Sequence, residues 1–366
     1  MSKPSIAFFG SSIVSAYWNG AATYYRGIIK YLFKLGYQVT FFEPDAYERQ
    51  QHRDLPDPFW CQVVVYPNSM RGVEQALDQA RSADILIKAS GVGVFDEFLE
   101  LAVPAMRRSG QTIIFWDVDA PATLERIKKN PEDIFRKLIP RYDYILTYGG
   151  GLPVVNAYKN MNAGECIPVY NALDPDTHFP VIPEERFMAD LSFIGNRLPD
   201  REARVKDFFL NVAEKMPEKT FILGGNGWED LPLSSNLKYM SHIFTRDHNA
   251  FNCSPLAVLN ISRQSMADYG FSPATRIFEA AGAGACIITD LWEGIDQFFE
   301  PDKEILVAED GRDVFDFMKM LDKPKARQIG QAARKAVLIK HTYKQRALQV
   351  DQILTSKIVF QKEFIN

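Results

Sequence analysis

The chain has 366 residues, a length that predicts about two domains, each large enough to bury its own core. Its 42 Lys and Arg residues nearly balance 46 Asp and Glu residues, which argues against the basic surface of a nucleic-acid-binding protein. Four widely spaced cysteines without a CxxC pair indicate neither a disulfide framework nor a zinc cage. Without a signal sequence or an apolar run long enough for a transmembrane segment, the sequence predicts a cytoplasmic protein.

Short apolar runs that end in Gly, Ser or Asp alternate with helical patterns, which indicates βα units and parallel sheets. After the first run we expect a helix with Ile28, Ile29, Leu32 and Phe33 on its buried face and Gly36 at its end. Strands of a first doubly wound sheet are expected at residues 5–9, 38–42, 62–66, 84–88, 112–116 and 144–147.

Residues 166–187 are rich in proline and have no periodic pattern, which favours a linker between domains. The strand pattern then restarts, at residues 191–194, 220–223, 257–261 and 285–289, and from about Asp313 the chain is helical. The fold class predicted is α/β, with two Rossmann-like domains that face a central cleft. We expect these domains at residues 1–170 and 171–340, with a final helix and tail at 341–366 that crosses back to the first.

The strongest motif lies between Tyr269 and Asp290. Ser272 is a good N-cap for a helix that would begin at the following proline, so unpaired N–H groups near Thr275 could bind an anion. Arg276 could clamp a phosphate, and Glu279, on the same helical face, could accept hydrogen bonds from ribose hydroxyls. A simple surface ion pair between Arg276 and Glu279 is the alternative.

Residues 276–290 resemble the ribose-binding helix of GT-B glycosyltransferases, especially the group similar to spore-coat maturation (CgeB-like) glycosyltransferases, which carries R-x-F-E-A-x-A-x-G-A-x-x-x-T-D. The resemblance is specific across about residues 190–346 and looser before them. It implies a GT-B fold, with a nucleotide-sugar donor in the C-terminal domain and the acceptor in the N-terminal domain. It also implies that Arg276 contacts the diphosphate and Glu279 the ribose. Phe271 stands where related retaining enzymes have a second glutamate, which leaves the stereochemistry open.

Further donor contacts are expected in loops that follow strands of the second domain. By the same resemblance, Arg197 would point at the phosphates, with Arg201 as its substitute. Gly225 lies in a glycine-rich turn that allows a ligand to approach the backbone, and Trp228 directly after that turn could stack on a base. Arg263 follows another strand. Solvated charge and a plain turn are the structural alternatives.

The N-terminal domain offers two carboxylates, Asp117 and Asp119, where a strand ends ahead of a helix. Either could deprotonate an acceptor hydroxyl, with Asp117 preferred, and helix capping is the alternative. The remaining residues expected on the sugar and acceptor side are Ser11, Ser12, Trp18 and Asn19.

These features predict a glycosyltransferase that moves a sugar from a nucleoside-diphosphate sugar to a hydroxyl of a glycan, small molecule or protein. We expect no metal ion and no cofactor, since arginines and a helix end can carry the diphosphate charge. A nucleotide-sugar epimerase of the same architecture and a non-catalytic sugar-binding protein are the alternatives. A dehydrogenase is disfavoured because GxGxxG is missing.

Overall fold

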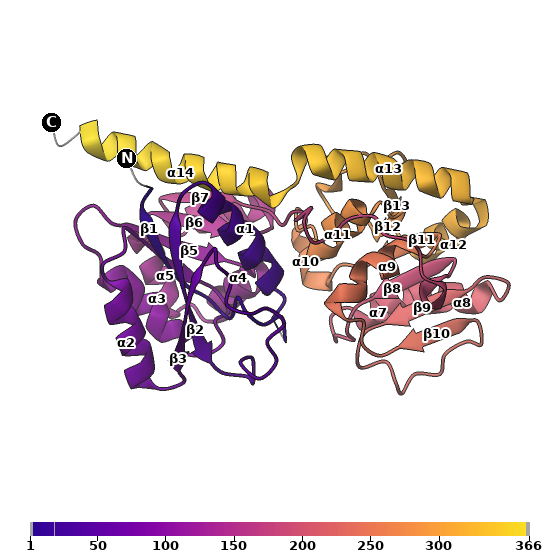
Figure 1. Cartoon of the computed structure of the whole chain (residues 1–366), viewed down its shortest axis with the longest axis horizontal. Coiled ribbons are helices and arrows are strands. Elements are labelled where there is room, and N and C mark those ends of the chain that lie inside the picture. Colours follow the sequence, from indigo (N-terminus) through magenta and orange to yellow (C-terminus); the bar gives the residue numbers. More distant parts are fainter. Residues whose placement is uncertain (1–2, 18, 364–366) are drawn as a thin grey trace. The chain divides into compact units, whose positions relative to one another are not determined.

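The computed structural model describes residues 3–17 and 19–363, with side chains up to Ser356. Contacts divide the chain into two units, the first made of Met1–Tyr170 and Tyr343–Asn366 and the second of Asn171–Thr342. Each unit is built on its own parallel sheet with helices around it (Figure 1).

The first unit contains a seven-stranded parallel sheet in the order β3-β2-β1-β4-β5-β6-β7. The order reverses between β1 and β4, and ligands of such sheets bind at the carboxyl ends of the strands near this reversal. The strands are β1 (Ser5–Phe9), β2 (Gln38–Asp45), β3 (Gln62–Pro67), β4 (Ile85–Ala89), β5 (Thr112–Asp117), β6 (Tyr144–Thr147) and β7 (Glu165–Pro168).

All six strands expected here are confirmed. The seventh, β7, was not expected, and the assignment of residues 166–187 to a linker is wrong at its start. A four-residue strand gives little periodic signal, and its terminal proline is tolerated because β7 lies at the edge of the sheet.

The helices of the first unit are α1 (Ala22–Lys34), α2 (Met70–Ala80), α3 (Asp96–Ala105), α4 (Ala120–Lys129), α5 (Ile134–Leu138), α6 (Gly151–Lys159) and α14 (Tyr343–Glu363). The expected helix α1 is confirmed, and it buries Ile28, Ile29 and Leu32. Phe33 is instead 40% exposed, with its ring set edgewise against the exposed ring of Phe59. It lies beyond the buried stripe of the helix.

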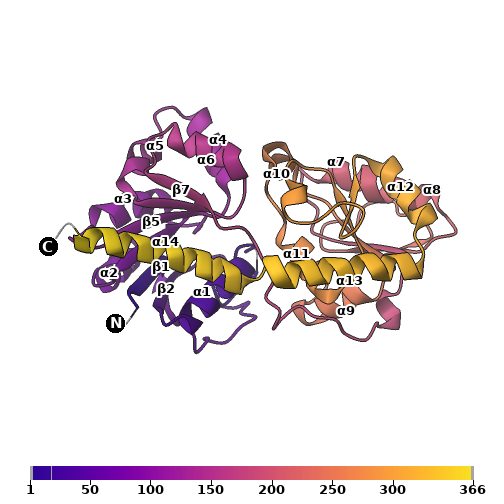
Figure 2. The ribbon, with the colours of Figure 1, turned by 90° about the horizontal axis from the view of Figure 1, so that it is seen from above.

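The last helix, α14, packs along α1 within the first unit (Figures 1 and 2). Gly27 makes this close approach possible, because a Cβ at this position would lie 2.2 Å from Cδ2 of Tyr343. Beside them, Tyr24 donates a hydrogen bond to the carbonyl of Val169 and accepts one from Trp116. The close packing of α14 on α1 therefore depends on Gly27.

We expect Gly27→Ala to lower the free energy of unfolding of the first unit by about 1–3 kcal/mol, the usual cost of overpacking. Gly20→Ala is the matched control, because a Cβ there would have nothing within 4 Å. Urea denaturation monitored by circular dichroism compares the two variants. Equal stability of both would show that the α1–α14 contact adapts without cost.

The second unit contains a six-stranded parallel sheet in the order β10-β9-β8-β11-β12-β13, with the reversal between β8 and β11. Its strands are β8 (Leu191–Ile194), β9 (Phe221–Gly224), β10 (Leu237–Met240), β11 (Ala257–Asn260), β12 (Ile287–Asp290) and β13 (Leu306–Ala308). The four expected strands are confirmed. The two edge strands, β10 and β13, were missed because they are short and their sequences do not alternate.

The helices of the second unit are α7 (Glu202–Val205), α8 (Asn211–Lys215), α9 (His248–Cys253), α10 (Gln264–Tyr269), α11 (Thr275–Ala283), α12 (Gly311–Met320) and α13 (Lys323–Lys340). A π-helical segment, Lys206–Leu210, joins α7 to α8. The core of this unit includes Phe193, Phe209, Trp228 and Ile288. The carboxyl ends of β8 and β11 thus rest on a continuous packed layer.

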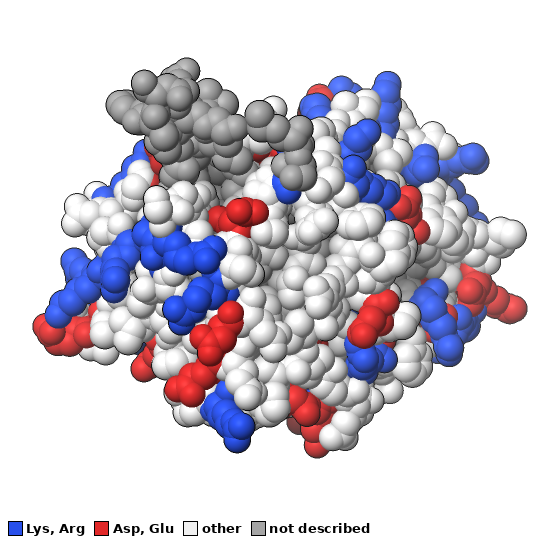
Figure 3. Space-filling model, turned by 60° about the vertical axis from the view of Figure 1, so that its left-hand side comes forward, with Lys and Arg blue, Asp and Glu red and all other residues white. Residues whose placement is uncertain are grey.

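None of the helices in the described part of the chain is long and apolar enough to cross a lipid bilayer. On the face drawn in Figure 3, basic and acidic side chains both occur, in several places next to one another, and wide areas carry neither. This distribution agrees with the nearly balanced composition.

Candidate functional site

Three arginines lie near one another at the carboxyl end of the second sheet. Arg201 precedes α7, Arg263 follows β11, and Arg276 lies in the first turn of α11. Burial lowers the pKa of Arg201 to about 10, and the positive charges of Arg276 and Arg263 add to this effect. Asp200 and Asp290 offset only part of it. The site is therefore positively charged and partly shielded from water.

Arg201 is held across the turn that follows β8. Its guanidinium donates to the carbonyl of Asn196, and a Cβ at Gly195 would lie 2.7 Å from its Nη2 atom. Its Nε is buried and has no hydrogen-bond partner among the described residues. Because a buried N–H without an acceptor is costly, this donor favours an incoming oxygen ligand.

The two other arginines differ in how they are held. Arg263 donates from Nε to Oδ2 of Asp200 at 2.7 Å. Arg276 has no carboxylate within ion-pair distance in the described part of the chain, and burial lowers its pKa. The surface ion pair between Arg276 and Glu279 that we considered as an alternative is therefore wrong.

Asp290, the last residue of β12, ties the surrounding loops together. Its carboxylate accepts from the backbone N–H of Ser262 at 3.0 Å and from Arg204 Nη2 at 2.6 Å. The bond to Ser262 fixes the backbone next to Arg263. Asp290, which ends the sequence motif, thus positions the loop that carries Arg263 but is not itself expected to contact the ligand.

Helix α11 begins later than expected. Ser272 is buried and donates its hydroxyl to the carbonyl of Gly270, so the expected N-cap at Ser272 is wrong. Positive φ angles at Gly270 (66°) and Phe271 (46°) keep this segment out of the helix. The helix starts at Thr275 after Ala274, which provides no side-chain cap. Because the first N–H groups of a helix have no acceptor within it, those of Thr275 and Arg276 can bind an anion.

Glu279 lies one turn along α11, and its side chain is only 12% exposed. Burial alone would raise the pKa of this carboxyl, but His178, His248 and Arg276 lower it below its ordinary value. Glu279 is therefore an ionised acceptor next to the arginine site.

Sequence reasoning missed the two histidines beside Glu279. His178 Nε2 lies 3.8 Å from Glu279 Oε1, and ligand atoms of His178, His248 and Glu279 all lie within 4.8 Å of one another. These side chains could hold a metal ion. They come from distant parts of the sequence, so no spacing pattern reveals them, and only the scarcity of histidine, five in the chain, is a signal.

Arg197 does not join the arginine site. It forms ion pairs with Glu202 at 2.7 Å and Asp230 at 2.6 Å, and these carboxylates raise its pKa. Two carboxylates already partner its guanidinium, so phosphate binding by Arg197 stays a prediction, and it is not the one that we favour. Arg201, the substitute, lies in the positive cluster instead.

The glycine-rich turn after β9 has a structural role. At Gly225, φ is +115° and a Cβ would lie 2.4 Å from the carbonyl oxygen of Gly195. Trp228 is fully buried and donates from Nε1 to the same oxygen at 2.8 Å. The expectation that Trp228 stacks on a base is wrong, because its ring belongs to the core. The turn instead braces the backbone near Arg201.

In the first unit, Asp117 is fully buried at the end of β5. Its carboxylate accepts from the hydroxyls of Ser90, Thr123 and Tyr158 at 2.8, 3.0 and 2.6 Å. These bonds and the burial leave no access for an acceptor, so the preference for Asp117 as a base is corrected. Asp119 is half-buried and accepts from the N–H of Ala122 at 3.4 Å, as the N-cap of α4.

The loop after β1 is closed by its own hydrogen bonds. Ser11 donates to Asn19 Oδ1 at 2.8 Å, and Asn19 Nδ2 donates to the carbonyl of Ser12 at 2.8 Å. Ser12 donates to Glu43 at 2.9 Å. All three expected side chains are buried, which corresponds to a structural loop in this conformation. Trp18, also expected on the acceptor side, lies outside the described residues.

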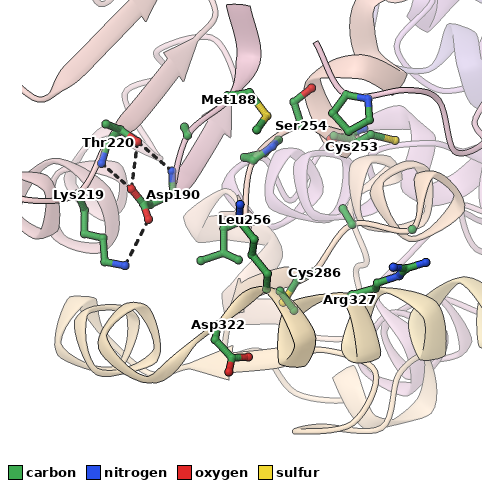
Figure 4. A pocket seen from close by; sticks show the side chains of 18 residues that line it. Met188, Asp190, Lys219, Thr220, Cys253, Ser254, Leu256, Cys286, Asp322 and Arg327 are labelled. Atoms are coloured by element: carbon green, nitrogen blue, oxygen red, sulfur yellow. Dashed lines mark hydrogen bonds and ion pairs between the residues drawn. The ribbon is translucent and has the colours of Figure 1, made fainter. Parts of the chain in front are cut away.

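A cavity of about 810 Å³ opens at the other end of the second sheet (Figure 4). Its lining residues include Asp190, Thr220 and Cys286, which precede β8, β9 and β12. Asp190 is bound to Lys219 at 3.2 Å and to the Thr220 N–H at 2.8 Å. Since parallel sheets bind ligands at the carboxyl ends of their strands, this cavity is a poor donor site.

Residues 201–352 match a protein-family model described as glycosyl transferase-like. The matched segment covers most of the second unit and the start of α14, and it is similar to glycosyltransferases. This match confirms the expectation that the protein is a glycosyltransferase enzyme. A search of curated proteins finds no match.

Solved structures show the GT-B fold over nearly the whole chain. Sucrose-phosphate synthase from Thermosynechococcus elongatus is 11% identical with a TM-score of 0.69, covering 98% of this chain and 100% of that one. Anabaena HepE in complex with UDP and glucose is 13% identical with a TM-score of 0.70, covering 97% and 100%. An alpha-glucosyltransferase in complex with UDP and a 13-mer DNA is 12% identical with a TM-score of 0.68, covering 97% and 100%.

The partly buried His248, next to Glu279, generates a prediction about pH. Burial, followed by Arg276 and His178, lowers the pKa of His248 from 6.5 to about 4, although Glu279 opposes this. Between these values the unfolded chain binds a proton that the folded chain does not, so stability falls as the pH falls from 6.5 to 4. We expect this residue to account for about 2–3 kcal/mol of that loss.

Urea denaturation between pH 4.5 and 7, with EDTA present, measures the effect. His248→Gln should flatten the dependence of unfolding free energy on pH. His242→Gln, at an exposed histidine of the same unit, should keep the wild-type slope. If both variants give the wild-type slope, His248 does not carry the expected shift.

Proposed function

We propose that the protein transfers a sugar from a nucleoside-diphosphate sugar to a hydroxyl acceptor without a metal ion. The observation that carries this proposal is the positive cluster of Arg201, Arg263 and Arg276 at the carboxyl end of the second sheet. We place the donor in the second unit and the acceptor in the first. The motif at residues 276–290 favours the CgeB-like group within the GT-B glycosyltransferases.

The donor's diphosphate fits the cluster chemically. Guanidinium groups bind phosphate oxygens through paired N–H donors, and the open N–H groups at the start of α11 add a favourable dipole. Negative charge builds up on the diphosphate as the sugar leaves, so fixed positive groups lower the barrier. The three arginines of the cluster and a helix end would supply this stabilisation without a cation, which supports the proposal of a metal-independent reaction.

Glu279 would bind the donor's ribose. Its ionised carboxylate has two oxygens, which can accept hydrogen bonds from two neighbouring hydroxyls. Two of the similar structures contain UDP, so a UDP-sugar is the donor class to test first.

The acceptor is a glycan, a small molecule or a protein. The net charge of −4 does not favour nucleic acid, although one similar structure contains DNA. We place the enzyme in the cytoplasm because each of its four cysteines, all within the described residues, is free.

We expect Arg201→Gln and Arg276→Gln each to weaken UDP binding by about 1.5–3 kcal/mol, roughly ten- to a hundredfold, because each loses a charge-assisted contact. Calorimetry in EDTA measures this affinity. The matched control is Arg327→Gln, an exposed arginine that lines the cavity of Figure 4. Loss of affinity in Arg327→Gln alone would move the donor to that cavity and reject the arginine cluster.

On the acceptor side we propose Asp119 as the general base. Unlike Asp117 it is partly open to solvent, and it lies two residues beyond the strand end.

We expect Asp119→Asn to reduce turnover by roughly 10²–10⁴, because an amide cannot take a proton, while UDP affinity stays near wild type. Asp117→Asn should instead lower the free energy of unfolding, by about 1–3 kcal/mol, because its hydroxyl partners lose a charged acceptor. Release of UDP from a UDP-sugar in the presence of acceptor measures turnover. Product analysis separates transfer from epimerisation, which needs no acceptor. More than a tenth of wild-type turnover in Asp119→Asn would exclude it as the base.

A further inference from the structure

His178, His248 and Glu279 form a compact cluster inside the second unit. His178 is buried in the segment after β7, His248 is the first residue of α9, and Glu279 lies on α11. One nitrogen or oxygen ligand atom from each lies within 4.8 Å of the others. Three separate segments therefore bring two imidazoles and a carboxylate to one point.

The contacts of Thr177 define one tautomer of His178. When the Thr177 hydroxyl donates to the carbonyl of Asp174 at 3.1 Å, it accepts from the Nδ1–H of His178 at 2.9 Å. In the neutral ring, Nε2 then presents a lone pair, and it faces Glu279 Oε1.

In this tautomer two acceptors face each other with no proton between them. A protonated ring could donate to the carboxylate, but 3.8 Å is too long for that hydrogen bond. A cation between the two atoms would satisfy both lone pairs. The same contact to Thr177 fixes the ring, which is the outer hydrogen bond usual for metal-binding histidines. A hydrogen bond with the backbone of Ile243 plays this part for His248.

We propose that His178, His248 and Glu279 bind a Zn²⁺ ion. Two imidazoles and one carboxylate are a set that zinc accepts in four-coordinate sites, with the fourth position left for water. Mg²⁺ and Ca²⁺ prefer oxygen ligands and do not suit two imidazoles. The ligand atoms need small inward movements to reach zinc bond lengths of about 2.0–2.2 Å.

Zinc at this cluster would inhibit the enzyme, a consequence that rests on the proposed ribose contact of Glu279. Coordination occupies the carboxylate that the ribose hydroxyls need, so Zn²⁺ and the nucleotide compete for one side chain. The reaction would run without metal, and zinc would lower donor affinity as it fills the site.

The first experiment measures zinc directly. Protein freed of metal with EDTA and then desalted is titrated with Zn²⁺ against a chromophoric chelator, and Co²⁺ is used for visible spectra. We expect one ion per chain and the strong absorption of four-coordinate Co²⁺. His178→Gln and His248→Gln should each weaken binding at least about tenfold, whereas His242→Gln, away from the cluster, should not.

The zinc site is overturned if the wild-type protein binds no Zn²⁺ below about 100 μM, or if all three variants bind it equally. Thermal melts in EDTA establish that each variant is folded. His178 is buried, so His178→Gln could fail to fold. In that case the Zn²⁺ affinity of His248→Gln, at a less buried residue, decides the test.

The second experiment measures UDP affinity in EDTA and in saturating Zn²⁺. We expect weaker binding with zinc in the wild type and in His242→Gln, and no zinc effect in His248→Gln. If zinc binds the three residues but leaves UDP affinity unchanged, the competition is overturned and Glu279 is not the ribose contact. UDP binding by Arg201→Gln and Arg276→Gln tests separately whether the arginine cluster binds the diphosphate.

Discussion

Uncompensated positive charge at the carboxyl end of the second sheet is the constraint around which this unit is organised. Burial already disfavours a charged Arg201, and its neighbours Arg263 and Arg276 repel it further. The fold sustains this cost through Asp290, which fixes the loop ahead of Arg263, and through the glycine turn that supports the backbone at Gly195. Binding a polyanion would relieve the repulsion among these arginines. The energetic cost of burying them therefore favours anion binding.

Two buried carboxylates of the first unit are treated in the opposite way. Asp117 and Glu43 accept hydrogen bonds from hydroxyl and N–H donors of the same unit, and the loop after β1 is closed by Ser11 and Asn19. These two carboxylates are therefore partnered within the fold, in contrast to the arginines at the carboxyl end of the second sheet.

The sequence predicted the α/β class, the two sheets and most strands, because buried parallel strands leave continuous apolar runs. It missed β7, β10 and β13, which are edge strands of three or four residues, too short to show a pattern. At the candidate site, Arg276 and Glu279 are brought together by local helical spacing, which a sequence displays. Which of Arg197 and Arg201 lies in the cluster depends on Glu202 and Asp230, and His178 meets His248 only through the tertiary fold.

The path of the chain sets an order of assembly. The second unit is one continuous segment, Asn171–Thr342, whereas the first is completed only by α14, which starts at Tyr343. During synthesis the second unit can close its core first, while α1 still exposes the groove at Gly27 that Tyr343 fills. A ribosome-bound intermediate would therefore contain a finished second unit and an incomplete first unit, whose open groove at Gly27 is a place where a chaperone could bind.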